Sequence, residues 1–381
     1  MAVSSPASIK RHFRKLRDPR LRRRRRHELL DIIVIAICAV IGDCDTWEDI
    51  GVFAKKREDW FRRFLALPHG VPSADTIARV FSRLEPAAFG ACFQGWVRAV
   101  SAAVGLPHIA IDGKTLRRSG DRASGLGPLH LVSAWATDQH LTLGQVAVAG
   151  KSNEIMAIPK LLELLDLHGA LVTIDAMGCQ KEIAAQVVAG GGDYVLTVKG
   201  NQEHLLEDIQ ATVEQALDGH LPAAQVDTYT TKERGHGRQE ERSYVVVHNV
   251  EGIRDRPLWR KLTTVGMCYS ERTVDGKTST EVRYFIGSRR LGAKRYGQAL
   301  RNHWGIENNL HWQLDMTFDE DASRIQERNA AHNFAWLRRI ALSLLKQHDS
   351  KMSIRGKRKA AALDSAFLEE IACRTVKLEN G

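Results

Sequence analysis

The chain has 381 residues, of which 44% are hydrophobic, enough for roughly two or three domains and a sizeable core. This apolar content excludes a wholly disordered chain. Lys and Arg outnumber Asp and Glu by 55 to 45, and this excess of 10 favours a polyanionic partner such as nucleic acid.

The positive charge is concentrated in residues 1–26, which predict a flexible basic arm. Its densest part is the run Arg22, Arg23, Arg24, Arg25 and Arg26. Because each neutralised phosphate releases counterions, we expect these five arginines to bind DNA. A solvated tail or a processing signal is the alternative explanation of the same charges.

Residues 27–100 predict an all-helical domain. The apolar run at 29–41 contains Asp31 and is too short to span a bilayer, so it indicates a buried helix and no membrane association is expected. The apolar residues from Ile77 to Leu84 recur at helical spacing after Pro72 and Ser73. This helix either reads DNA or packs within a bundle.

The six cysteines include no C-x-x-C pair, which argues against a zinc site and against thioredoxin-like chemistry. Free thiols are typical of a reducing compartment, and we expect the protein in the bacterial cytoplasm.

Residues 105–347 predict a mixed α/β domain. Strands are expected at 108–114, 129–137, 141–149, 170–174 and 194–198, with helices at 154–167 and 180–189. Three meandering strands followed by β-α-β alternation predict a mixed sheet flanked by helices, with parallel pairing in its last part.

A β-rich insertion is predicted at about 222–290, because short β-branched runs alternate there with glycine-containing turns. A long helix should follow from about 294 to 317, and another from about 330 to 346. Residues 348–381 predict a basic, mobile tail.

Two aspartates follow apolar strands, and this position allows a carboxylate to enter a cleft while the strand stays buried. Asp112 ends the first predicted strand and Asp175 ends the fourth. If the strands are neighbours, the two carboxylates could hold a divalent cation such as Mg²⁺. Alternatively, each aspartate only caps a strand or a following helix.

A third carboxylate, Glu307, lies on the long predicted helix. His303, Glu307 and His311 are spaced four apart and therefore share one face. This face either lines a site or is the solvent face of an amphipathic helix. Glu154 competes for the third position, although a glutamate at a helix start has an ordinary capping explanation.

Eight short stretches of the sequence are specific when taken together. They are Asp18-Pro19-Arg20, Leu67-Pro68-His69-Gly70-Val71-Pro72-Ser73, Ile111-Asp112-Gly113-Lys114, Ser152-Asn153-Glu154-Ile155, Thr173-Ile174-Asp175-Ala176, Val198-Lys199-Gly200-Asn201-Gln202, His303-Trp304-Gly305-Ile306-Glu307-Asn308 and Phe318-Asp319-Glu320-Asp321. With them, the chain resembles the bacterial DDE transposases of the H-repeat-associated group, which are found as insertion sequences and beside Rhs elements. The resemblance extends from about residue 10 to residue 347.

The resemblance implies an RNase H-like core, a helical domain near the N-terminus and a catalytic triad of Asp112, Asp175 and Glu307 binding Mg²⁺, for which Mn²⁺ can substitute. It implies DNA cleavage and strand transfer. The implied partners are the terminal inverted repeats and target DNA, with a homodimer pairing the two ends at the nucleoid.

The sequence departs from related transposases around the glutamate. Where many carry a Tyr-Arg-Glu-Lys signature, this chain has Leu300, His303 and Leu314 at the Tyr, Arg and Lys places. We expect His303, together with Lys114 and Lys199, to contact DNA. A solvated lysine in a turn is an alternative for Lys199.

Two other functions fit the same sequence. A non-catalytic DNA-binding regulator derived from a transposase would have lost a carboxylate, whereas all three are present. A nuclease that cuts without joining would differ in its products.

Overall fold

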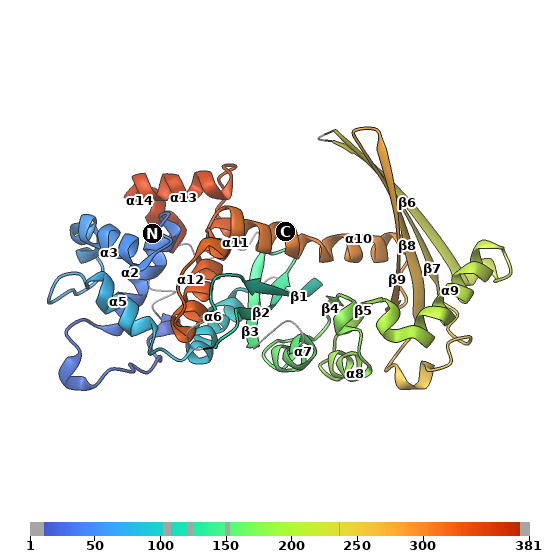
Figure 1. The fold of residues 1–381 in the computed structure, drawn as a ribbon, viewed down its shortest axis with the longest axis horizontal. Helices are drawn as coiled ribbons and strands as arrows, with labels where there is room; N and C mark the ends of the chain where they lie inside the picture. Colours follow the sequence, from blue (N-terminus) through green and yellow to red (C-terminus); the bar gives the residue numbers. More distant parts are fainter. Residues whose placement is uncertain (1–10, 102–107, 121–124, 149–152, 236, 374–381) are drawn as a thin grey trace.

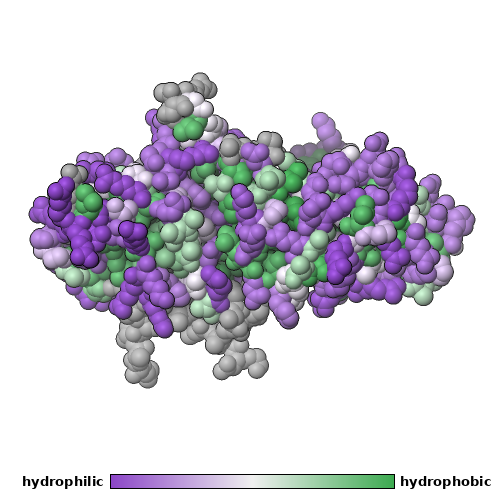
Figure 2. Space-filling view, turned by 90° about the horizontal axis from the view of Figure 1, so that it is seen from below, coloured by the Kyte–Doolittle hydropathy of each residue, from purple (hydrophilic) through white to green (hydrophobic). Residues whose placement is uncertain are grey.

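The computed structural model describes residues 11–101, 108–120, 125–148, 153–235 and 237–373. The protein is elongated, with the N-terminal helices at one end and four long strands at the other (Figure 1). Seen from below, hydrophilic side chains dominate both ends and hydrophobic ones gather along the middle (Figure 2).

One nine-stranded sheet runs through the molecule in the order β3-β2-β1-β4-β5-β9-β8-β7-β6. Its first half comprises β1 (His108–Leu116), β2 (Leu129–Ala136), β3 (Leu141–Val148), β4 (Leu171–Ile174) and β5 (Asp193–Val198). β1 pairs antiparallel with β2 and parallel with β4, which pairs parallel with β5. The expected mixed sheet with a parallel last part is therefore present.

The predicted insertion consists of four strands that extend this same sheet. They are β6 (Val226–Gly235), β7 (Arg238–Val247), β8 (Thr264–Val274) and β9 (Lys277–Gly287). β9 joins them to the core by pairing antiparallel with β5. The sequence did not indicate β6, because this edge strand is mostly exposed and lacks an apolar alternation.

Helices cover both faces of the sheet. α7 (Glu154–Leu162) packs on β2 and β3, and α8 (Lys181–Ala189) packs on β5. Figure 1 shows both on the side opposite α10 (Ala293–His303). α9 (Glu203–Leu217) lies against β7 and β8.

The helices before the sheet share a core with helices from the end of the chain. They are α2 (Leu29–Ile41), α3 (Trp47–Lys56), α4 (Glu58–Arg62), α5 (Ala74–Phe81) and α6 (Pro86–Ser101). α12 (Arg328–Gln347) packs against α2, α5 and α6 as well as β3. α2 is buried on nearly every side, as its uniformly apolar sequence predicts. Within the described ranges, no helix has the length and apolar character needed to cross a membrane.

The predicted helix at 294–317 is interrupted. α10 ends at His303, a π-helical turn spans Glu307–His311, and α11 (Trp312–Met316) completes it. A π turn is rare and is often found at functional sites, because the extra residue per turn shifts the side chains that follow it.

The expectation of a mobile tail from residue 348 is wrong for its first part. α13 (Ile354–Leu363) and α14 (Ser365–Cys373) pack against α2 and α12. Arg358 is fully buried, donates a hydrogen bond to the Val40 carbonyl and pairs with Asp45 at 3.0 Å. The charges of Lys357 and Arg358 are therefore used inside the protein, whereas Arg355 and Lys359 are exposed.

The arm is also more ordered than predicted, although residues 1–10 lie outside the described part. Phe13 is buried and its ring lies 5.2 Å from that of Phe89. Arg20 pairs with Asp18 at 2.8 Å and donates a hydrogen bond to the His27 carbonyl. Residues 11–27 therefore fold onto the helices.

Candidate active site

Two aspartates lie side by side on neighbouring strands. β1 and β4 are parallel and in register, with Ile111 opposite Ile174, so that Asp112 and Asp175 follow directly. Asp112 does not end its strand as predicted, because β1 continues to Leu116 through pairing with β2. Asp175 does follow the last residue of β4.

The Asp175 carboxylate is fixed by the turn that it caps. Its Oδ1 accepts hydrogen bonds from the backbone N–H groups of Met177 at 3.1 Å and Gly178 at 3.4 Å. Oδ2 makes no hydrogen bond to any residue that the structure describes. Capping thus accounts for the hydrogen bonds of Oδ1 and leaves Oδ2 available for a ligand.

Glu307 opens the π turn and is exposed. It lines a cleft of about 1030 Å³ between the outer strands β7 to β9 and the end of α10. Trp304 lines the same cleft, and the Arg283 guanidinium lies 3.9 Å from the centre of its ring. The carboxylate of Glu307 is therefore reachable by a large substrate.

The charges of the three acidic residues influence one another's ionisation. Burial raises the pKa of Asp112 to about 7, and the negative charges of Asp175, Glu307 and Glu154 contribute to this rise. Burial and Glu154 also raise the pKa of Asp175, against the lowering effect of its capping hydrogen bonds and of Lys199. Carboxylates that repel one another in this way are stabilised by a cation.

The donor set suits a hard divalent cation, because Asp112, Asp175 and Glu307 offer carboxylate oxygens. In the described part of the chain, no three acidic, histidine or cysteine side chains already converge closely enough to hold a metal ion. The carboxylates would have to move towards one another on metal binding.

Two contacts between a histidine and a carboxylate near the predicted site were not recognised from the sequence. His311 Nδ1 lies 3.4 Å from Asp112 Oδ2, and burial lowers the pKa of His311 to about 3, so the ring is neutral. His130 Nε2 lies 2.6 Å from Glu154 Oε1, and both side chains are buried. Spacing could not reveal these contacts, since the partners come from separate elements.

Gly113 explains how this second pair approaches β1. A Cβ atom at Gly113 would collide with the Glu154 carboxylate and the His130 ring. The Asp-Gly dipeptide is therefore required by packing against Glu154 and His130, and it is the one local signal that could have indicated them.

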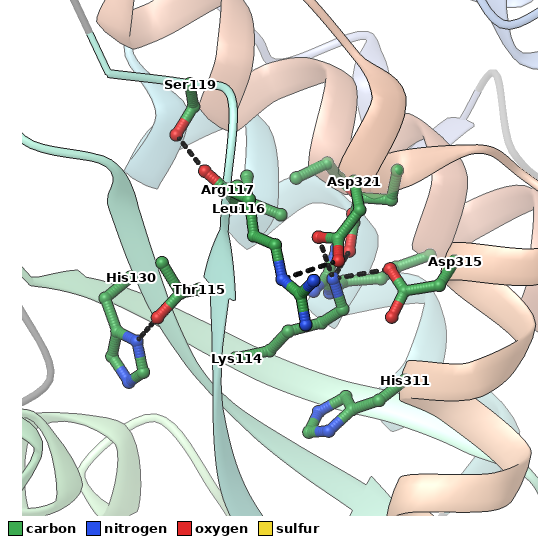
Figure 3. A network of polar contacts seen from close by, with 12 residues as sticks. Lys114, Thr115, Leu116, Arg117, Ser119, His130, His311, Asp315 and Asp321 are labelled. Atoms are coloured by element: carbon green, nitrogen blue, oxygen red, sulfur yellow. Dashed lines mark hydrogen bonds and ion pairs between the residues drawn. The ribbon is translucent and has the colours of Figure 1, made fainter.

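Lys114 does not have the predicted role. Only 8% of its side chain is exposed, and Nζ lies 2.7 Å from Asp315, 3.1 Å from Asp321 and 3.3 Å from Glu320 (Figure 3). Since these three carboxylates surround the ammonium group, we correct the expectation that Lys114 contacts a DNA phosphate. It joins β1 to the segment after Glu307.

His303 is also turned into the protein. Its Nδ1 lies 3.0 Å from Thr173 Oγ1, which in turn lies 2.9 Å from Nε2 of His108. Burial lowers the pKa of His303 to about 4, so the ring carries no charge at neutral pH. We therefore correct the expectation that His303 contacts DNA.

The other residues predicted to contact DNA are Lys199 and the arginines of the arm. Their described side chains are exposed and lie in two separate parts of the molecule. Lys199 follows β5, and its charge lowers the pKa of Asp175, which places it near the carboxylates. Arg22, Arg23, Arg25 and Arg26 are exposed on the arm, beside the N-terminal helices. The side chain of Arg24 lies outside the described residues.

Two family models match this chain, and together they cover most of its length. Residues 104–344 match the family model described as Transposase DDE domain, and residues 10–97 match the DDE_Tnp_1-associated model. The Escherichia coli (strain K12) protein YhhI, whose name assigns it to the H repeat-associated transposases, is 38% identical over 91% of this chain and 92% of its own length.

Two other relatives are similar to this chain over most of their own lengths. YncI of Escherichia coli O157:H7, also named as a transposase, is 38% identical over 93% of each chain. An uncharacterized protein of Xanthobacter autotrophicus, from the dhlA 3' region, is 44% identical over 69% of this chain and 88% of its own length. The chain therefore belongs to the family of DDE-domain transposases, in the group of the H repeat-associated transposases.

Proposed function

We propose that this protein is an active transposase that cleaves the ends of an insertion sequence and joins them to target DNA. The observation that carries the proposal is the register of β1 and β4, which sets Asp112 beside Asp175, with the charge of Glu307 acting on Asp112. Two aspartates on neighbouring strands, with the charge of a third carboxylate acting on one of them, are the kind of donor set that metal-assisted phosphoryl transfer uses.

An RNase H-like core is part of this proposal. In support, β1, β2 and β3 form an antiparallel meander, and β4 and β5 are added parallel to β1. The triad then lies where the carboxyl ends of parallel strands meet a helix from the opposite face. We regard the N-terminal helices, together with the arm, as the associated DNA-binding part.

Asp112, Asp175 through Oδ2, and Glu307 would hold Mg²⁺, with Mn²⁺ able to substitute. A divalent metal held there would supply Lewis-acid activation of the attacking hydroxyl and charge stabilisation of the leaving oxygen of the phosphodiester. Asp175 is held by its turn, so it orients the site with little reorganisation. His311 borders Asp112 with a neutral ring, so it places no positive charge beside that carboxylate.

The DNA partners would be the terminal inverted repeats and target DNA. Lys199 is exposed beside Asp175 and can meet a phosphate of the strand being cut. Arg22, Arg23 and Arg26 can contact the duplex further from the cut. Pairing of two ends calls for a homodimer, and we place the protein in the cytoplasm at the nucleoid.

The test uses purified protein and a duplex that carries the inverted repeat flanking the gene, with and without Mg²⁺. Wild type should nick the repeat end and join its 3′-hydroxyl to a plasmid only when metal is present. Asp175→Ala and Glu307→Gln should abolish cleavage while binding persists, because metal serves the transition state more than docking. Glu214→Gln, on the exposed surface of α9, is the matched control.

Each alternative has its own outcome. Cleavage without joined product would indicate a nuclease. Binding without metal-dependent cleavage by wild type would indicate a non-catalytic regulator and would overturn the proposal.

A further inference from the structure

A cationic pocket lies beside helix α5 in the N-terminal helical part. Figure 1 shows this part at the other end of the molecule from the strands of the insertion. We propose that this site, the α5 pocket, binds a backbone phosphate of double-stranded DNA and sets α5 against the duplex. The inference rests on the proposed function for the presence of DNA, and it adds where and by which residues the helical end holds it.

The α5 pocket has a volume of about 450 Å³ and forms where three segments meet: the end of the arm, the turn at 69–73 and helix α5. No acidic residue lines it. Its charged or titratable lining residues are Arg20, Arg26, His27, His69, Arg79 and Arg83. The hydroxyls of Ser73 and Thr76 add hydrogen-bonding groups. Arginine and hydroxyl donors without a carboxylate suit a phosphate.

The charges of the pocket are available to a ligand. Arg26, Arg79 and Arg83 are exposed, and none of them makes an ion pair with another described residue. The pKa of His27 is lowered mainly by burial and further by the charges of Arg26 and its neighbours, which reflects the positive potential there. Other exposed arginines, such as Arg62 and Arg254, are by contrast paired with carboxylates.

The pocket is preformed, because internal hydrogen bonds hold the arm in place. Arg20 is the exception among the lining arginines: it pairs with Asp18 and donates to the His27 carbonyl at 2.6 Å. Arg25 donates to the Arg20 carbonyl at 2.9 Å. The His27 ring contacts the Gly70 carbonyl at 3.2 Å and so joins the arm to the 69–73 turn. Little ordering is needed when a ligand binds.

Helix α5 presents a polar face beside the pocket. Its apolar face, with Ile77, Val80 and Phe81, is buried against the bundle. Thr76 and Arg79 are three residues apart on α5 and lie on the side of the helix that lines the pocket, and Arg83 lines it from the turn after the helix ends. Exposed arginines that come from the helix, the turn after it and the arm fit the repeated phosphates of a duplex better than an isolated anion.

The experiment measures the affinity for a fluorescein-labelled duplex of random sequence by anisotropy, over a range of KCl concentrations. Arg79→Ala/Arg83→Ala should lower the slope of log affinity against log salt by about two, since each lost phosphate contact removes roughly one. Affinity near physiological salt should fall roughly tenfold. Arg79→Lys/Arg83→Lys should keep most of the slope, because lysine preserves the charge.

The matched control is Arg260→Ala. Arg260 is an exposed arginine in the segment between β7 and β8. Figure 1 shows these two strands at the opposite end of the molecule from α5. The slope for Arg260→Ala should equal that of wild type. A single strand of the same length should lose less affinity than the duplex in the α5 double variant, whereas an equal loss would overturn the assignment to duplex DNA.

An unchanged slope in a double variant that melts like wild type would overturn the inference. This failure is distinguishable from failure of the proposed function, which would appear as wild type binding the duplex without metal-dependent cleavage. Absence of any DNA binding by wild type would overturn both.

Discussion

Lys114 Nζ lies 2.7 Å from Asp315 Oδ1, and this contact joins the strand that carries Asp112 to the helix that follows Glu307. Glu320, itself fully buried, receives Lys114 on one carboxylate oxygen and Arg339 on the other. The distance between two acidic positions of the proposed triad therefore depends on a buried network of charges (Figure 3).

Removing the lysine should destabilise the fold. Lys114→Met leaves Asp315, Asp321 and Glu320 without their shared cation, and loss of one partner of a buried network costs about 3–5 kcal/mol. Urea denaturation of the two proteins measures this cost. Lys232→Met, which removes an exposed lysine paired with Glu241, is the control and should cost less than about 1 kcal/mol. Equal midpoints for wild type and Lys114→Met would contradict the network's role.

The same network should make stability depend on pH. Burial alone would raise the pKa of Glu320, but the charges of Arg339 and Lys114 lower it from 4.5 to about 2. A lowered pKa in the folded state means that ionised Glu320 contributes stability fully above pH 4.5, and that this contribution is lost as the pH falls towards 2. Glu320→Gln should therefore destabilise the protein more at neutral pH than in acid.

Denaturation of wild type and Glu320→Gln at several pH values checks this. The difference in the free energy of unfolding should shrink steadily as the pH is lowered below 4.5. A difference that stays constant would show that packing of the side chain, and not its charge, matters.

Ionisation of Asp112 should lower the stability of the metal-free protein, whereas ionisation of Glu320 raises it. Burial and neighbouring carboxylates raise its pKa from 3.8 to about 7, so the folded state retains a proton that the unfolded state releases between these values. Ionisation of Asp112 therefore lowers the stability of the metal-free protein as the pH rises through this range. In EDTA at slightly alkaline pH, Asp112→Asn should melt roughly a few degrees above wild type.

Adding Mg²⁺ completes this test. Metal should raise the melting temperature of wild type, since binding to the folded state stabilises it, and should barely affect Asp112→Asn. A wild-type melting temperature that is insensitive to both Mg²⁺ and Mn²⁺ would argue against a metal site at Asp112.

Different residues of the arm should serve folding and DNA binding. Phe13→Ala removes a buried ring from its contact with Phe89 and should cost about 3–5 kcal/mol of stability. Arg22→Ala/Arg23→Ala alters exposed side chains and should leave thermal stability unchanged. The double variant should instead flatten the salt dependence of duplex binding, measured by anisotropy. If Phe13→Ala melts normally, the arm is not part of the fold.

Much of this protein was determined by local sequence. The strands from 108 to 198 and the helices between them follow apolar periodicity, which depends on neighbours in the chain, and they lie close to where the pattern predicts them. Asp175 after its strand and Glu307 in the helical region were visible for the same reason, whereas Asp112 lies within β1 and not at its end. β6 escaped detection because an exposed edge strand needs no apolar alternation.

Tertiary structure decided which charges meet solvent. Lys114, His303 and Arg358 were interpreted as surface groups, yet each is buried by partners far away in the chain, such as Asp315, Thr173 and Val40. Burial of an ionisable group depends on the whole set of elements packed around it, and no local spacing encodes that set. The register of β1 against β4, which sets Asp112 beside Asp175, is likewise a pairing between distant segments.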